Sequence, residues 1–395
     1  MSCMKETFAL MLLFALWSGQ FVSAQTHIVL HSFAGGTDGS GPYGSLILDS
    51  RGNLYGTTLS GGAYGYGTVF KVTPTGVEKI LYSFKGYPDG ESPFAGLVAD
   101  ANGNAYGTTQ SGGRFGYGTV FEITSKGREK ILYSFGLEQD GGAPYSALIM
   151  DKQGNLYGTT AFGGSYYGGE CSGTGCGTVF KLSTSGVEEV LHSFEGTDGD
   201  SPLAGVIMDG QGNLYGTTAV GGNQGCQGGC GTAFQLRTSG ALRVFEFRDD
   251  EGGFIPFAGL VRDAAGNFYG TTSRTVQNWG TAFKLTKSGK YEVLHTFTSR
   301  ADGATPSGDL LLGDNGNLYG TTSYGGNNCS QYSGGCGTVF QLTPDGAEKI
   351  LHSFAGGADG AFPEAGLVRD SAGNLYGTTG SGGTFNFGTV FKIIP

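Results

Sequence analysis

The chain has 395 residues, of which 77 are glycine, and its formal net charge is −10. The glycines follow no three-residue period and Pro is scarce, which excludes collagen, while abundant Phe and Tyr indicate short strands joined by tight turns rather than disorder. The sequence holds no cluster of Lys and Arg of the kind that binds a duplex, so we expect no nucleic-acid partner.

The first 24 residues have the pattern of a signal peptide. Lys5 precedes an apolar run from Phe8 to Trp17, and Val22-Ser23-Ala24 offers small residues for cleavage before Gln25. The alternative is a retained membrane anchor, but the run is shorter than the ~20 residues that a spanning helix needs. We therefore expect a secreted or periplasmic protein with no membrane span after cleavage.

One string of four residues organises the rest of the chain. Tyr-Gly-Thr-Thr occurs seven times, at intervals of 50 to 58 residues. Its tyrosines are Tyr55, Tyr106, Tyr157, Tyr215, Tyr269, Tyr319 and Tyr376. A repeat of this length suits one four-stranded blade of a β-propeller.

The second repeat predicts four strands, at 96–100, 104–109, 118–123 and 130–135, separated by Gly-rich or Asn-Gly turns. The chain begins its first repeat with a lone fourth strand at 28–33 and stops after a third strand at 388–393. These two incomplete ends add up to one blade. The sequence thus predicts an all-β fold in which residues 25–395 form a single seven-bladed propeller, closed by the N-terminal strand pairing with the last blade.

Six cysteines remain once the leader with Cys3 is set aside, and they form three close pairs: Cys171 with Cys176, Cys226 with Cys230, and Cys329 with Cys336. An even number in an exported chain predicts disulfides. A shared metal site is the alternative, but the pairs fall in different repeats, whereas thiolate ligands must converge.

The recurring blocks Asn-Leu-Tyr-Gly-Thr-Thr, Gly-Thr-Val-Phe-Lys-Leu and Leu-His-Ser-Phe resemble the GloVer tandem-repeat family of exported bacterial proteins. The resemblance covers the whole mature chain, and it implies no particular activity. Many members are similar in ending on a surface-anchoring tail. Because this chain stops at Pro395, inside the last blade, we expect free secretion or a periplasmic location.

The long, variable loops between the second and third strands share one face with the loops between blades. Loops on a rigid scaffold commonly carry function, so we expect binding on this face. Its non-repeating aromatic and amide residues are the candidate ligand-binding residues: Tyr166, Tyr167, Trp279, Asn278 and Tyr332. The alternative is that they pack the loops.

Two carboxylates break the repeat pattern near the central channel. Asp309 stands where other units have Gly, Ser or Ala, and Glu364 where others have Phe, Tyr, Leu or Ser. They are the candidates for a channel-mouth site, with Ca²⁺ as the metal that such a site would take. The alternative is that they are solvated residues at the channel mouth.

Two further polar sets recur in the repeats. An Asp-Gly pair precedes most first strands, and four histidines share one position in the fourth strand. Because a turn is needed in every blade, whereas a site is usually built once, we interpret both sets as structural.

These observations predict an exported, monomeric binding or scaffold module without a cofactor, engaging a carbohydrate, a peptide or a surface protein. The alternatives are a metal-assisted hydrolase resembling lactonases and a structural envelope protein.

Overall fold

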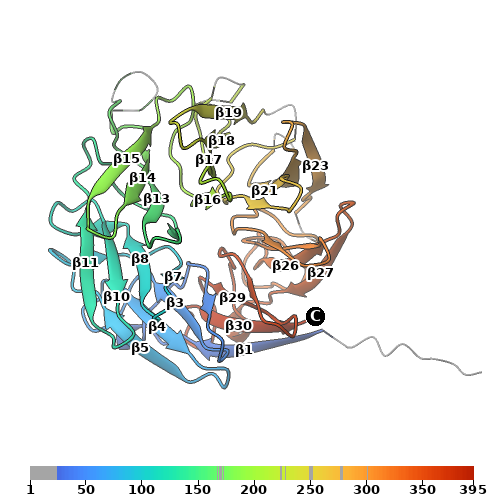
Figure 1. The fold of residues 1–395 in the computed structure, drawn as a ribbon. Coiled ribbons are helices and arrows are strands. Elements are labelled where there is room, and N and C mark those ends of the chain that lie inside the picture. The colour runs from blue at the N-terminus through green and yellow to red at the C-terminus, as the bar shows by residue number, and fades with distance from the viewer. Residues whose placement is uncertain are drawn as a thin grey trace, which may run out of the picture.

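The computed structural model describes residues 25–166, 168, 171, 173–222, 225–226, 228–248, 252–275, 279–299 and 301–395. They form seven four-stranded antiparallel sheets arranged as a ring (Figure 1). The expected signal peptide at 1–24 lies outside the described residues. The described residues include two 3₁₀ turns, Gly36–Asp38 and Gly357–Asp359. In the same part of the chain, no helix is long and apolar enough to cross a membrane.

The first strand of each blade is its inner strand, and each has two residues. They are β2 (Ile47–Leu48), β7 (Val98–Ala99), β12 (Ile149–Met150), β16 (Ile207–Met208), β20 (Val261–Arg262), β24 (Leu311–Leu312) and β28 (Val368–Arg369). The second strands carry the Tyr-Gly-Thr-Thr string. They are β3 (Leu54–Thr58), β8 (Ala105–Thr109), β13 (Leu156–Thr160), β17 (Leu214–Thr218), β21 (Phe268–Thr272), β25 (Leu318–Thr322) and β29 (Leu375–Thr379).

The third strands are β4 (Thr68–Val72), β10 (Thr119–Ile123), β14 (Thr178–Leu182), β18 (Thr232–Leu236), β22 (Thr281–Leu285), β26 (Thr338–Leu342) and β30 (Thr389–Ile394). The fourth strands lie on the outside of the ring (Figure 1): β5 (Glu78–Ser83), β11 (Glu129–Ser134), β15 (Glu188–Ser193), β19 (Leu242–Glu246), β23 (Tyr291–Thr296), β27 (Glu348–Ser353) and β1 (Thr26–Ser32). We number the blades I to VII from β2–β5 to β28–β30, and a small extra pair, β6 (Gly90–Glu91) with β9 (Ser111–Gly112), joins the loops of blade II.

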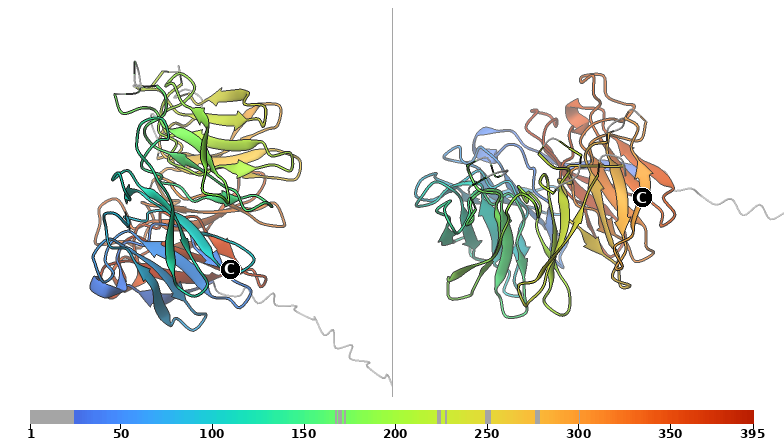
Figure 2. Two further views of the ribbon diagram at one scale, coloured as in Figure 1. Left: turned by 60° about the vertical axis from the view of Figure 1, so that its left-hand side comes forward. Right: turned by 90° about the horizontal axis from the view of Figure 1, so that it is seen from above.

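The ring closes as the sequence predicts. Strand β1 pairs antiparallel with β30, from Thr26 opposite Ile394 to Ser32 opposite Thr389, and so completes blade VII. Figure 2 shows the blue N-terminal strand lying beside the red C-terminal strands in the same blade. No outer edge is left open at the junction, which is the benefit of closing a sheet ring.

Phenylalanines pack the blades against one another at all seven interfaces. In each interface a Phe that follows the fourth strand of one blade meets a Phe on the third strand of the next. The pairs are Phe33–Phe70, Phe84–Phe121, Phe135–Phe180, Phe194–Phe234, Phe247–Phe283, Phe297–Phe340 and Phe354–Phe391, with ring centroids 5.0 to 5.3 Å apart. These steeply tilted, largely edge-to-face contacts add to the burial of the rings, which are almost completely shielded from solvent.

The repeated polar residues are structural, as the sequence indicates. In the second repeat the Asp100 carboxylate accepts hydrogen bonds from the backbone and side chain of Asn104 and from the Tyr106 hydroxyl, which fixes the first hairpin. Six blades share this arrangement. Burial alone would raise the pKa of Asp100, but the hydrogen bonds from Asn104 and Asn102 together hold it below its usual value.

The Asp of the Asp-Gly pair is also engaged by its own blade. Asp89 accepts hydrogen bonds from the Lys85 amide at 3.0 Å and from the Tyr82 hydroxyl at 2.8 Å. In other blades a histidine takes the place of Tyr82, as in the His192–Asp198 contact of 2.8 Å. The Asp-Gly pairs and the fourth-strand histidines are therefore parts of one turn-and-strand arrangement.

Candidate functional site

Among the described residues, the predicted loop residues Tyr166, Trp279 and Tyr332 belong to three different blades, III, V and VI. Tyr166 is exposed at the edge of its loop, whereas Tyr332 is partly buried and packs its ring on Phe362 with centroids 4.8 Å apart. Tyr167 and Asn278 lie outside the described residues. Whether these loop residues bind a ligand remains a prediction.

Trp279 occupies a position that recurs in every blade. Its carbonyl accepts a hydrogen bond from the Thr305 amide of the following inter-blade loop, as the Tyr66 and Tyr117 carbonyls do from the next loops in their blades. The indole is 53% exposed. The backbone of Trp279 thus has a fold role, while its ring stays accessible on the long-loop face.

All three predicted disulfides are present: Cys171–Cys176, Cys226–Cys230 and Cys329–Cys336. The second cysteine of each pair is buried and stands in the same recurring position as Trp279. Its carbonyl likewise bonds the loop that leads to the next blade. Each disulfide therefore fixes the start of a long loop against the neighbouring blade.

Asp309 and Glu364 lie in adjacent blades by the channel. Asp309 is exposed to channel solvent, and its Oδ1 accepts a 2.7 Å hydrogen bond from the Gly259 amide across the blade boundary. The protein atoms crowded around this carboxylate raise its pKa. Burial also raises the pKa of Glu364, which lies near Tyr43 at the channel rim. Among the described residues neither carboxylate belongs to a cluster of three metal-ligating side chains.

A cavity lies elsewhere, between blades IV and V on the short-turn face, and a missing residue explains it. In the other six blades the fourth strand carries a β-bulge, such as the register shift between Val69 and Phe70, which accommodates an extra leucine, Leu81. Strand β19 pairs with β18 without a shift and has no such leucine. Gly289 in the next turn therefore faces the Arg243 guanidinium, whereas the equivalent Gly76 and Gly346 meet a leucine carbonyl.

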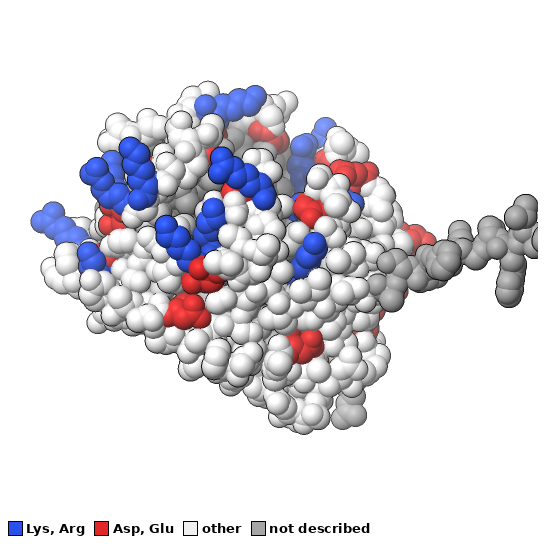
Figure 3. Space-filling view, turned by 90° about the horizontal axis from the view of Figure 1, so that it is seen from below, with Lys and Arg blue, Asp and Glu red and all other residues white. Residues whose placement is uncertain are grey.

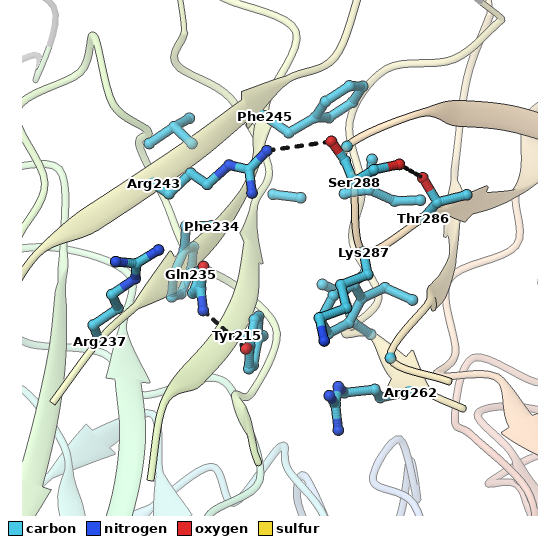
Figure 4. Close-up of a pocket in the computed structure, with 17 residues that line it drawn as sticks. Tyr215, Phe234, Gln235, Arg237, Arg243, Phe245, Arg262, Thr286, Lys287 and Ser288 are labelled. Carbon is cyan, nitrogen blue, oxygen red and sulfur yellow. Dashed lines mark hydrogen bonds between the residues drawn. The ribbon is translucent and has the colours of Figure 1, made fainter. Parts of the chain in front are cut away.

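The resulting cleft has a volume of about 310 Å³ and four cationic side chains, and no acidic residue lines it. Arg237 and Arg243 come from blade IV, and Arg262 and Lys287 come from blade V (Figure 4). Hydrogen-bonding groups are interspersed among them on Gln235, Tyr215, Thr286 and Ser288. Within the described ranges none of the four cations forms an ion pair. Figure 3 shows that Lys and Arg side chains, with Asp and Glu among them, also lie over the lower side of the ring.

Several contacts hold the polar lining of the cleft in place. Gln235 Nε2 donates to the Tyr215 hydroxyl at 2.9 Å, and that hydroxyl donates to Asp209 at 2.9 Å. Burial and the hydrogen bond to Asp209 raise the pKa of Tyr215. The positive charge of Arg262 acts in the opposite direction and partly offsets this rise. The Arg262 guanidinium lies 5.8 Å from the centroid of the Phe268 ring. The cleft thus offers fixed hydrogen-bond donors, aromatic faces and unpaired positive charge.

Sequence reasoning placed function on the opposite face and missed this cleft. The usable signal was small: blade IV is one residue short between Arg237 and Phe247, and Arg243 and Lys287 stand near that gap. Their proximity depends on how two blades pack, which no single repeat displays.

The comparison with solved structures supports the overall fold. No curated protein matches the chain. Among solved structures, the extracellular domain of a one component system from B. thetaiotaomicron is similar at 11% identity and a TM-score of 0.57, covering 91% of this chain. This chain spans 39% of that protein's length. The periplasmic gluconolactonase PpgL from Pseudomonas aeruginosa is similar at 14% identity and a TM-score of 0.49, over 79% of this chain and 85% of that one.

The family comparison covers the chain almost from end to end. The model of the Gloeobacter/Verrucomicrobia repeat matches residues 17–227, 164–331 and 223–395. These matches span all seven blades and bear out the resemblance carried by the repeated blocks. The chain belongs to the Gloeobacter/Verrucomicrobia repeat family.

Proposed function

We propose that this protein is an exported, non-catalytic binding propeller whose ligand is an acidic carbohydrate held in the basic cleft between blades IV and V. The observation that carries the proposal is a set of four cations that form no ion pair within the described part of the chain and have no acidic neighbour in the lining, on a chain whose net charge is −10. Four cations in one cleft repel one another and so destabilise the folded protein. A bound anion would offset this repulsion, so we expect an anionic ligand.

The chemistry of the lining favours a sugar acid or sugar sulfate. Arginine guanidinium groups bind carboxylate and sulfate-like oxygens with paired hydrogen bonds, and Lys287 adds a point charge. The side chains of Gln235, Thr286 and Ser288 suit sugar hydroxyls. The rings of Phe245 and Phe268 supply apolar faces for the pyranose ring.

Export is supported by two features. The first is the leader pattern at residues 1–24, with cleavage proposed after Ala24. The second is the set of three disulfides, which persist in oxidising compartments. An acidic polysaccharide outside the cytoplasm fits this location. We assign no metal-assisted hydrolytic role to Asp309 and Glu364, because neither belongs to a group of three metal-ligating side chains in the part of the chain that the structure describes.

The test is a binding screen of the purified protein against polyuronates, sulfated polysaccharides and neutral glucans. We expect saturable binding to one acidic class, weakened by salt because the charges are exposed. The Arg262→Glu/Lys287→Glu double variant should lose that binding by at least about tenfold. Lys126→Glu is the matched control, since Lys126 lies in the corresponding turn of blade II and does not line the cleft.

Two results would overturn the proposal. One is equal binding by the cleft variant and the Lys126→Glu control. The other is binding to neutral glucans alone, lost on Trp279→Ala or Tyr166→Ala, which would place the ligand on the long-loop face instead.

A further inference from the structure

Two blade boundaries bring a histidine and two carboxylates together from three separate segments. At the boundary of blades V and VI, His295 comes from β23, Asp302 from the loop that follows, and Glu348 from β27. His295 Nε2 lies 3.6 Å from Asp302 Oδ2 and 3.8 Å from Glu348 Oε1. At the boundary of blades VII and I, His31, Asp38 and Glu78 repeat the arrangement, with 3.3 Å from His31 Nε2 to Asp38 Oδ2.

We propose that each of these two clusters binds a divalent transition-metal cation, with one imidazole and two carboxylates as ligands. In each cluster all three ligand atoms lie within 4.8 Å of one another. A metal at bond lengths of about 2.0 to 2.2 Å separates its ligands by little more than 3 Å, so a small contraction of each cluster completes the coordination.

The first cluster holds an unpartnered imidazole nitrogen beside an unpartnered carboxylate oxygen. His295 Nε2 and Glu348 Oε1 are shielded from solvent and have no hydrogen-bond partner. Glu78 Oε1 shares this state in the second cluster, as do Glu129 Oε1 and Glu188 Oε1 at two boundaries that have no histidine, so the imidazole nitrogen is what sets the first cluster apart. The Glu348 side chain is only 12% exposed, yet it lies beside the Asp302 carboxylate. Two buried carboxylates side by side repel each other unless a proton or a metal lies between them.

The ligands are also held in position by their surroundings. The Thr298 backbone amide and hydroxyl both donate to the Asp302 carboxylate, at 2.9 and 3.0 Å. The imidazole of His295 packs nearly perpendicular to Phe297 with centroids 4.8 Å apart. In the second cluster the Ala34 amide donates to Asp38 at 2.6 Å. Such supporting contacts orient metal ligands and reduce the entropy lost on binding.

Two other boundaries show the same framework without the metal ligand. At the boundary of blades I and II a tyrosine, Tyr82, replaces the histidine, and its hydroxyl donates to Asp89 beside Glu129. Tyr133 and Asp140 repeat this beside Glu188. The neutral phenol donates a hydrogen bond to the Asp carboxylate, and it is a poor metal ligand. The chain therefore contains its own folded, metal-free version of the site.

The ligand set selects the class of metal. Imidazole with carboxylates suits Zn²⁺ and similar first-row cations, whereas Ca²⁺ takes six to eight oxygen ligands and Mg²⁺ keeps most of its water. We leave the third cluster, His27 with His352 and Asp359, out of the proposal, because it offers one carboxylate instead of two and both of its imidazoles bond that carboxylate.

The test compares untagged wild-type protein with a His31→Tyr/His295→Tyr double variant, which copies the tyrosine boundaries. Both are stripped with a chelator, saturated with Zn²⁺, freed of excess metal by gel filtration and analysed for bound metal. We expect the wild type to retain about two more Zn²⁺ ions per chain than the double variant. Zn²⁺ should raise the Tm of the wild type but not that of the variant.

Equal metal content and equal Tm responses in the two proteins would overturn the proposal, as would an equal Tm gain from Ca²⁺ in the wild type. If the double variant does not fold, Tyr82→His provides the converse test, since it creates a new cluster of one imidazole and two carboxylates with Asp89 and Glu129. The proposal predicts about one additional Zn²⁺ ion, and no gain would contradict it.

Discussion

The His27 imidazole stacks on that of His352, with ring centroids 3.9 Å apart, at the place where the first strand of the chain joins the last blade. His27 Nδ1 lies 3.0 Å from one oxygen of Asp359, and His352 Nε2 lies 3.1 Å from the other. In most other blades a glutamate stands at the position of His27. The ring is thus closed by a side-chain network as well as by backbone pairing.

We predict that His27→Ala lowers the free energy of unfolding by about 2 kcal/mol, since a hydrogen bond to a charged group contributes about 1.5–3 kcal/mol. The hydrogen bonds from His27 and His352 outweigh burial and hold the pKa of Asp359 well below its usual 3.8. This contribution is present above that value and is lost as the pH falls. Urea unfolding at pH 7 measures it, with Ile28→Ala on the same strand as the control. An equal loss in the control would contradict the prediction.

The glutamates at the tyrosine boundaries predict a pH dependence of the opposite sign. Burial, and then the nearby Asp89 and Asp140 charges, raise the pKa values of Glu129 and Glu188 from 4.5 to about 7. The folded protein therefore holds these protons more tightly than the unfolded chain. The stability from this source is full below pH 4.5 and is lost as the pH rises to about 7.

We expect the Tm to fall by several degrees between pH 5 and pH 8, and we expect the Glu129→Gln/Glu188→Gln variant to show a shallower fall. Calorimetry across this range checks both statements. Glu122→Gln, a carboxylate on the third strand of blade II, serves as the control. Parallel Tm profiles for the double variant and the wild type would show that these two carboxyl groups do not cause the dependence.

Blade VI lacks one element that stabilises the first hairpin of its neighbours. Gly313 stands where the other six blades have Asp. In blade VI the side-chain oxygen of Asn315 accepts the hydrogen bond from the Asn317 backbone amide, at 3.1 Å. Gly313→Asp restores an acceptor for Asn317 and for the Tyr319 hydroxyl. We predict a gain of about 0.5–1 kcal/mol. Gly313→Ala separates the effect of the carboxylate from that of removing a glycine, and an equal gain in Ala would refute the hydrogen-bond explanation.

A second repeated contact is missing at the boundary of blades V and VI. In most blades the first Thr of the Tyr-Gly-Thr-Thr string donates to a carbonyl of the next blade, as Thr217 does to Ala258 at 2.9 Å. The Thr271 hydroxyl, at the boundary that precedes Asp309, is buried without a partner. Because the protein atoms around Asp309 disfavour its charged form, we predict that Asp309→Ala raises the Tm at pH 8. A lower Tm would show that the hydrogen bond from the Gly259 amide to Asp309 outweighs this cost.

The sequence predicted the architecture because the fold is repeated. Seven copies of a string such as Leu54–Thr58 specify seven equivalent strands, and the incomplete ends specify closure. The disulfides followed from the spacing of Cys171 and Cys176. The boundary clusters were harder to see, because residues such as His295 and Glu348 lie 53 positions apart and meet only through the packing of two blades.

The basic cleft was missed for a related reason. The shortened strand in blade IV is visible in the sequence as one absent leucine. Its effect is a cleft lined by side chains of blades IV and V, which appears only when the two blades pack together. The repeat pattern directs attention to long loops, whereas here a deletion within a strand produced the cavity.

The most direct test of the binding proposal restores the missing leucine. A Leu inserted between Val244 and Phe245 reproduces the bulged strand of the other blades and should fill the gap beside Gly289. We would measure the affinity of this variant for the acidic polysaccharide that the wild type binds, together with its Tm. Loss of binding by at least about tenfold at an unchanged or raised Tm is the predicted result. Full binding by a folded variant with the cleft closed would contradict the proposal that this cleft holds the ligand.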